Sequence, residues 1–169
     1  CLIAAMTLSS TRDLAAITNR LRRMFDLSCD PHEVHRHLSA DPAFQKTKPG
    51  RRLPGGWDPF ELGVRAVLGQ QISVAAATTL AGRLASSFGD PVAGGVGVLF
   101  PKPDRLAEAD VAKIGLPSKR ADCLRALATA AMHGALKSTT GALEETTARL
   151  CEIPGVGPWT AQYLAMRAF

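Results

Sequence analysis

Apolar residues recur every three or four positions over much of the chain, which is the spacing that lets an α-helix bury one face. Phe60, Val64, Val67 and Leu68 form one such stripe. The other stretches with this spacing are 14–24, 77–84, 124–131 and 142–150. The strict alternation of apolar and polar residues that marks a half-buried strand does not stand out in the sequence. The pattern therefore predicts an all-α fold.

Residues that favour helix starts precede several of these stretches. Asp58 is placed to cap a helix whose first turn holds Pro59, and Glu61 completes a capping box with Asp58. Ser73 and Ser118 are predicted to cap two further helices. The remaining predicted starts are at Ser10 and Asp30, and the predicted ends are at Gly89 and Gly134.

The stretch 46–56 is rich in Gly, Pro and basic residues, so we predict a loop and a domain boundary there. We assign 57–169 to one helical domain that is incomplete at its C-terminal end, and 11–56 to connecting helices and the loop. The first residues, 1–10, are predicted to be the remnant of a mixed α/β N-terminal domain, with 2–8 as its last strand. The chain does not start with methionine, which indicates a fragment.

Composition narrows the class of protein only moderately. Hydrophobic residues make up 46% of the chain, which is typical of a globular protein, and no stretch is long and apolar enough to span a bilayer. The formal net charge of +5 permits nucleic-acid binding without requiring it. The four cysteines are scattered and form no CxxC pair, so reduced buried thiols are favoured over a disulfide framework.

The most informative segment is 153–161, which reads Ile-Pro-Gly-Val-Gly-Pro-Trp-Thr-Ala. Gly155 and Gly157 allow a tight turn, and Pro158 suits the first turn of a new helix. Such a turn presents free backbone N–H groups at a helix N-terminus, where a phosphate can bind. Because the contact reads no base, it suits DNA binding that is independent of sequence. The alternative is a plain connector between two helices.

Together with two upstream blocks, this segment resembles a known family. Residues 153–161 resemble the hairpin of the helix-hairpin-helix DNA glycosylases. The blocks 58–73 and 115–121 resemble the 3-methyladenine glycosylase II branch, and the resemblance covers about 21–169 in the family's order. It implies a DNA repair enzyme that flips out alkylated purines and hydrolyses their N-glycosidic bond. It also implies the all-α domain of that family, placed after the mixed α/β remnant.

The resemblance assigns several residues to DNA. Gly155 and Gly157 match hairpin glycines whose amides face a phosphate, and Gln71 matches the residue that wedges into the duplex where the target base has left. For Gln70 and Gln71 the alternative is a role in ending a helix. The DNA-binding residues implied in this way are Gln70, Gln71, Gly155, Val156, Gly157 and Thr160.

The resemblance also implies an ion. The backbone carbonyls of Cys151, Ile153 and Val156 match positions that hold a monovalent cation, Na⁺ or K⁺, between protein and DNA in relatives. No other cofactor is expected.

Trp159 and Tyr163 are four residues apart, so they share one face of the predicted helix. In the family this face lines the base pocket, where electron-rich rings stack on an alkylated, cationic base. The alternative is core packing. The glycosylase-lyases have a lysine at the position of Trp159, where its amine forms a Schiff base. Tryptophan there implies a monofunctional enzyme that uses water.

The family's catalytic aspartate follows soon after the hairpin's second helix, so we expect it beyond Phe169 and predict that this chain alone is inactive. We also expect the helix face formed by Ala161, Leu164, Ala165 and Ala168 to be partly exposed for want of packing partners.

The expected partner is double-stranded DNA with alkylated bases. The protein is expected to act in a bacterial cytoplasm, associated with the nucleoid. No membrane partner is expected, and the complete protein is expected to be a monomer. One competing hypothesis is a non-catalytic helix-hairpin-helix DNA-binding module. Another is an endonuclease III-like lyase with an iron–sulfur cluster, which Trp159 disfavours.

Overall fold

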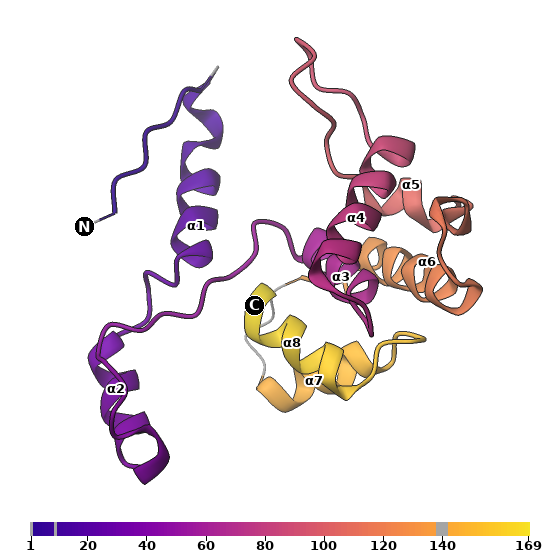
Figure 1. Cartoon of the computed structure of the whole chain (residues 1–169). Coiled ribbons are helices and arrows are strands. Elements are labelled where there is room, and N and C mark those ends of the chain that lie inside the picture. The colour runs from indigo at the N-terminus through magenta and orange to yellow at the C-terminus, as the bar shows by residue number, and fades with distance from the viewer. Residues whose placement is uncertain (1, 9, 138–141) are drawn as a thin grey trace. The chain divides into compact units, whose positions relative to one another are not determined.

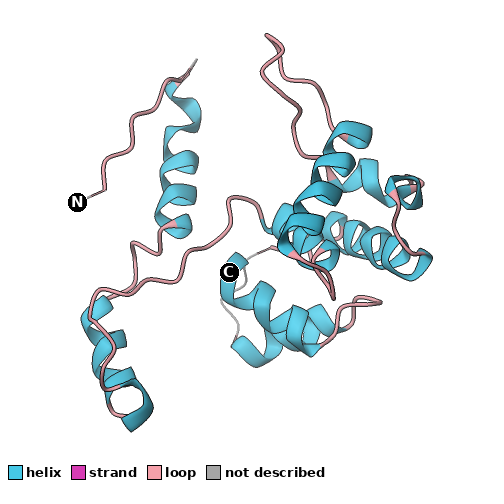
Figure 2. Cartoon of the chain, viewed as in Figure 1, coloured by secondary structure: helices cyan, strands magenta, loops and turns pink. Residues whose placement is uncertain are grey.

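The structure is a computed structural model that describes residues 2–8, 10–137 and 142–169. The chain divides into two compact units, Cys1–Trp57 and Asp58–Phe169. Positions 1 and 9 of the predicted remnant at 1–10 lie outside the described residues. Figure 2 shows helices joined by loops, and within the described ranges the β pairing is limited to an isolated bridge between Pro91 and Val98. The predicted all-α fold is therefore confirmed.

The first unit contains short helices whose starts are capped by side chains. The Ser10 hydroxyl accepts a hydrogen bond from the Arg12 amide at 3.1 Å, and the Asp30 carboxylate accepts one from the His32 amide at 2.8 Å. This backbone hydrogen bond lowers the pKa of Asp30. The elements are η1 (Thr11–Asp13), α1 (Leu14–Met24), α2 (Pro31–Ser39) and η2 (Pro42–Phe44).

The segment 2–8 carries no strand assignment, so the predicted last strand of a mixed domain is not formed within the described residues. None of the described residues of the first unit is buried. The buried apolar residues of the described chain all belong to the second unit.

The second unit is a bundle arranged around α3, which contacts α4, α6 and α8 (Figure 1). Its buried residues form a continuous apolar core. The elements are α3 (Pro59–Leu68), α4 (Val74–Phe88), α5 (Pro103–Ala107), η3 (Val111–Ile114), α6 (Ser118–Met132), α7 (Leu143–Cys151) and α8 (Pro158–Ala168).

Helix α3 begins where the sequence predicts. The Asp58 carboxylate accepts a hydrogen bond from the Glu61 amide at 2.9 Å, and Pro59 occupies the first turn. The predicted stripe is buried, from Phe60 at 6% exposure to Leu68 at 0%. The Glu61 carboxylate, the predicted second half of a capping box, pairs with Arg65 at 2.7 Å.

The starts of α4 and α6 differ in how far they follow the prediction. The Ser73 hydroxyl caps α4 by accepting from the Ala76 amide at 3.2 Å. Ser118, by contrast, is the first residue of α6, and the N-cap is Pro117 with no side-chain cap. The prediction that Ser118 caps α6 is wrong, because the helix begins one residue earlier than predicted: Pro117, at φ −58° and ψ 144°, is the N-cap and Ser118 is already helical.

The apolar face of α8 is covered by this chain's own helices. Ala161, Leu164 and Ala168 are between 0% and 2% exposed, and Ala165 is 8% exposed. Helix α3 covers this face, and a Cβ built on Gly63 would lie 3.7 Å from Leu164, which is ordinary van der Waals contact. The expectation that this face would be left partly exposed is therefore wrong.

Candidate nucleic-acid interface

The hairpin between α7 and α8 is a tight, anchored turn. The Ile153 amide donates to the Leu150 carbonyl at 3.2 Å, and the Val156 amide donates to the Ile153 carbonyl at 2.9 Å. The Ile153 and Val156 side chains are 5% and 4% exposed, so both insert into the core. Pro154 and Gly155 between them are exposed. The tip of the turn is thus held rigidly at the surface.

The two hairpin glycines are needed for different reasons. Gly155 has φ +85°, and a Cβ there would lie 2.7 Å from both Cβ and Sγ of Cys123 on α6. The positive φ and the contact with Cys123 each exclude a side chain at Gly155 for reasons of folding, independently of DNA binding. Gly157 has φ −87° and ψ 173°, and a Cβ there would have no neighbour within 4 Å. Nothing in the described part of the chain requires glycine at position 157.

The N-terminus of α8 faces outward without a side-chain cap. Gly157 is the N-cap residue, no side chain caps the helix, and Pro158 occupies the first turn. The first N–H groups of a helix have no acceptor within the helix, and they carry the positive end of its dipole. A phosphate can accept hydrogen bonds from these amides without any basic side chain.

An aromatic stack stands beside this helix start. The Trp159 and Tyr163 rings have centroids 5.6 Å apart and are inclined by 9° to each other. The predicted shared face is therefore present. Trp159 is 71% exposed, which excludes core packing for that ring. The Arg167 guanidinium lies 5.7 Å from the Tyr163 ring on its other flank, so the row continues one further turn along α8.

Two cavities meet at Trp159. One of about 510 Å³ lies between the end of α3 and the start of α8, and one of about 460 Å³ lies beside the aromatic stack. Both volumes are in the range of about 300–1,000 Å³ usual for small-molecule sites. The first is lined by Gly69, Gln70, Gln71, Gly157, Pro158, Trp159 and Thr160, and the second by Leu143, Trp159, Gln162, Tyr163 and Met166.

The turn between α3 and α4 lies across the first cavity from the hairpin. Gln71 is exposed and has φ +58°, a left-handed conformation that is uncommon for a residue other than glycine. The Gln70 side-chain amide donates to the Thr160 hydroxyl at 3.2 Å, and Arg120 donates to the Gln70 carbonyl at 2.8 Å. The structure thus brings together Gln70, Gln71 and the hairpin, as the sequence predicts.

Comparisons with known proteins bear on this geometry. The sequence profile of the family described as the AlkA N-terminal domain matches residues 1–58. DNA-3-methyladenine glycosylase 2 of Escherichia coli is 43% identical over 155 residues, which are 89% of this chain and 54% of that protein. The chain is therefore homologous to part of the AlkA-type 3-methyladenine DNA glycosylases.

Two further matches concern the sequence and the fold. A Mycobacterium tuberculosis protein, named as a probable bifunctional transcriptional activator and DNA repair enzyme AlkA, is 39% identical over 169 residues, which are 96% of this chain and 34% of that protein. The fold matches the 3-methyladenine DNA glycosylase structure from Archaeoglobus fulgidus with a TM-score of 0.73 at 24% identity, over 93% of this chain and 57% of that one. The chain thus spans about half the length of the Escherichia coli relative.

The structure changes the interpretation of several predicted glycosylase residues. Thr160 is only 4% exposed and accepts the Gln70 amide, so this pair is engaged within the protein. Sequence reasoning missed two further residues, Arg120 on α6 and Gln162 in the second cavity. Arg120 lies in the block 115–121 that resembles the family, which was the available signal.

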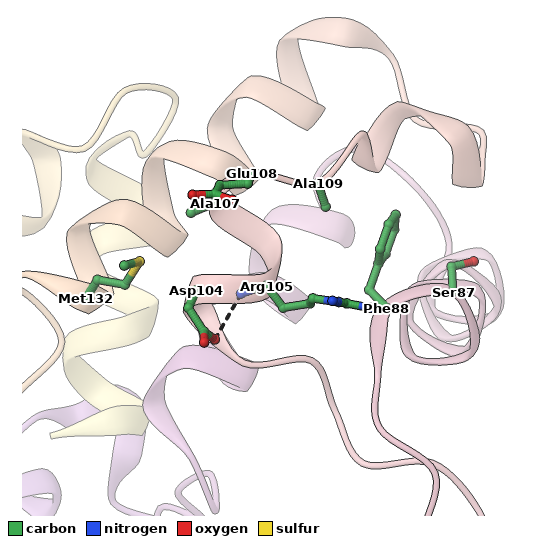
Figure 3. Close-up of a pocket in the computed structure, with 8 residues that line it drawn as sticks. All are labelled: Ser87, Phe88, Asp104, Arg105, Ala107, Glu108, Ala109 and Met132. Carbon is green, nitrogen blue, oxygen red and sulfur yellow. Dashed lines mark hydrogen bonds between the residues drawn. The ribbon is translucent and has the colours of Figure 1, made fainter.

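A third cavity, of about 580 Å³, lies at the ends of α4, α5 and α6. Figure 3 shows Asp104 accepting from the Arg105 amide, at 2.9 Å, while the Arg105 side chain extends toward Phe88. Glu108 adds a second carboxylate to the walls, and no hairpin residue lines this cavity. With two carboxylates and one guanidinium, its walls offer no net positive charge to a DNA backbone.

Proposed function

We propose that this chain is the DNA-binding and base-recognition part of a monofunctional glycosylase that removes alkylated purines of the 3-methyladenine type from DNA. The base would be flipped out of the duplex and its N-glycosidic bond hydrolysed. The observation that carries the proposal is the stacked pair of Trp159 and Tyr163, exposed directly beside the hairpin. The printed names of the Escherichia coli and Archaeoglobus fulgidus relatives support it.

The chemistry of the aromatic stack suits an alkylated base. Alkylation at a ring nitrogen gives a purine a positive charge, and an exposed indole attracts a cation over its face. Tyr163 supports the Trp159 ring from behind at 5.6 Å, so the outer indole face is already oriented. A flipped base would gain stacking worth about 1–3 kcal/mol there.

The lining of the two cavities favours hydrolysis over lyase chemistry. A glycosylase-lyase needs a lysine amine at the reacting sugar carbon. Neither cavity beside Trp159 is lined by a lysine, and Trp159 itself holds the position that the resemblance assigns to that amine. Water is therefore the proposed attacking group.

We further propose that the present chain binds DNA without releasing bases. Departure of the base leaves positive charge on the sugar, and a nearby carboxylate lowers that barrier. Neither cavity beside Trp159 is lined by Asp or Glu. By itself the chain would therefore behave as a helix-hairpin-helix DNA-binding module, which is the competing function.

The proposed grip on DNA is the outward-facing start of α8. Its amides would bind a backbone phosphate close to Gly157, where the absence of a side chain leaves room. We propose that a monovalent cation would bind between this turn and DNA, held by the neutral carbonyl oxygens of Cys151, Ile153 and Val156 that the resemblance assigns to it. The Ile153 carbonyl accepts one hydrogen bond, from Val156 at 2.9 Å, and keeps a second lone pair. The bound ion would supply positive charge toward the phosphate.

The proposed partner is double-stranded DNA that carries alkylated bases, and the proposed state of the complete protein is a monomer. We place this activity at the bacterial nucleoid, in the cytoplasm. Among the described residues, no helix meets the length and hydropathy needed to cross a bilayer.

The test is Trp159→Ala, measured by fluorescence anisotropy on a duplex with N-methylated purines and on an undamaged duplex of the same sequence. We expect the preference for the methylated duplex to fall by about 5- to 150-fold, which corresponds to the loss of one stacked base. Trp57→Ala is the matched control, since it replaces the other tryptophan of the chain.

Two outcomes would contradict the proposal. Equal loss of binding to both duplexes, together with a large fall in melting temperature, would mean that Trp159 serves stability. In the same samples, chromatography should detect no freed methylpurine from the 169-residue chain. Release above the untreated background would show that a carboxylate of this chain supports catalysis.

A further inference from the structure

Gln71 has an unusual backbone that something must hold. Its φ is +58°, it lies three residues after the last residue of α3, and it is exposed in the lining of the cavity that the hairpin also lines. Left-handed backbone at a non-glycine residue persists where the surroundings fix it. Gln71 itself has no hydrogen bond among those that define this site, so the constraint comes from its neighbour.

Gln70 is held from two directions. Its side-chain amide donates to the Thr160 hydroxyl of α8 at 3.2 Å, and its carbonyl accepts from the Arg120 guanidinium of α6 at 2.8 Å. These partners lie 90 and 50 residues away in the sequence. One residue therefore links the α3–α4 turn to both α8 and α6.

Both hydrogen bonds are partly shielded from solvent. Thr160 is 4% exposed, and Gln70 and Arg120 are half-buried. The Arg120 bond involves a charged donor, which makes it stronger than a neutral hydrogen bond. Thr160 is also next to Trp159 in the first turn of α8. Any shift of these two hydrogen bonds would therefore move the α3–α4 turn relative to the stack of Trp159 and Tyr163.

We infer that Arg120, Gln70 and Thr160 form a positioning clamp that sets Gln71 at a fixed place relative to the hairpin and Trp159. The inference rests on the proposed function and on the role that the resemblance implies for Gln71, which is to enter the duplex where the base has left. Gln70 then acts inside the protein, where its side-chain amide and its backbone carbonyl together anchor the turn that carries Gln71. None of the three clamp residues needs to touch DNA.

The test uses near-isosteric changes. Thr160→Val removes the acceptor and keeps the shape, and Arg120→Lys keeps the charge but loses the planar guanidinium. The matched controls are Thr129→Val, whose hydroxyl bonds only the Arg125 carbonyl of its own helix, and Arg65→Lys, whose partner is Glu61 on the same helix. All variants are checked by thermal unfolding.

The readout is the ratio of affinities for two duplexes, one with a stable abasic-site analogue and one intact. A side chain can insert into the duplex only where a base is missing from the stack, so the ratio of the two affinities reports on Gln71. Both clamp variants should lower the ratio at least about fivefold, as expected for residues coupled in one network, and leave intact-duplex affinity within about twofold. The two controls should leave the ratio unchanged.

A double-mutant cycle completes the test. In a Gln71→Ala background, Thr160→Val should not lower the ratio further, because the group that it positions is already gone. Additive effects would overturn the inference, as would clamp variants that match their controls or that weaken both duplexes equally. If the unmodified chain bound neither duplex, the proposed function would fail first, and the inference would fail with it.

Discussion

Replacing each hairpin glycine by alanine separates what the fold needs from what DNA needs. At Gly155 the new Cβ would lie 2.7 Å from both Cβ and Sγ of Cys123, in a backbone with φ +85°. At Gly157 the same methyl group would enter open space, in an extended conformation that any residue adopts. The two variants differ by position alone, so each is the control for the other.

The magnitudes follow from this geometry. For Gly155→Ala, left-handed backbone costs about 1–2 kcal/mol. Forcing a methyl group into a packed contact costs about 1–3 kcal/mol. The loss of stability is therefore roughly 2–5 kcal/mol, or roughly 8–20 °C in melting temperature for a domain of this size. Gly157→Ala should change stability by no more than about 1 kcal/mol and in the stabilising direction, since alanine restricts the unfolded chain.

DNA binding should show the opposite order once both proteins are folded. A Cβ at position 157 would stand between the first-turn amides and the phosphate, and the loss of one hydrogen bond to a charged group should weaken duplex binding about tenfold or more. Thermal unfolding measures the first effect, and anisotropy at a temperature where both variants are folded measures the second. Unchanged duplex affinity for Gly157→Ala would refute the hairpin grip. Equal destabilisation by both changes would refute the packing argument.

Further predictions concern stability and thiol chemistry. Asp58→Ala removes the cap of α3 and should cost about 0.5–2 kcal/mol by thermal or denaturant unfolding, whereas a change below about 0.3 kcal/mol would contradict the capping assignment. Burial raises the pKa of the Cys123 thiol, while Cys151 at the end of α7 is exposed, so iodoacetamide near pH 8 should modify Cys151 first by peptide mass spectrometry. Because the protonated thiol is favoured in the folded state, this protection should weaken only as the pH rises toward the raised pKa. Early labelling of Cys123 in folded protein would show that the hairpin opens away from α6.

The local parts of the fold could be predicted from the sequence because their causes are local. Asp58 and the stripe that begins at Phe60 define α3 within a short segment, and the Gly155–Pro158 string defines the turn. The wrong predictions concern contacts between residues that are far apart in the sequence. Which helix covers the apolar face of α8 depends on how α3 and α8 pack together, and helical spacing alone cannot show it. The exposure of the Trp159 side chain likewise depends on which residues surround it in the folded chain.

Arg120 shows the same limit within the site. Its bond to the Gln70 carbonyl joins residues 50 positions apart, and a backbone carbonyl leaves no mark in the sequence. From the sequence alone, the side-chain amide of Gln70 is assigned to DNA, because nothing in the sequence shows that it pairs with Thr160. Sequence patterns therefore reveal which segments form helices and turns, whereas the partners of individual polar groups require the structure.

In the proposed function, the arrangement of charge would let the site act on any DNA sequence. The hairpin offers backbone amides and a helix dipole rather than basic side chains, so the proposed grip would be directed at phosphates and would read no base. Recognition would be left to the Trp159 face, because an indole attracts a cationic ring more than a neutral one. The acidic cavity that contains Asp104 and Glu108 is lined by the ends of α4, α5 and α6 and by none of the hairpin. Repulsion of phosphates from those carboxylates would favour the orientation in which the hairpin meets the duplex.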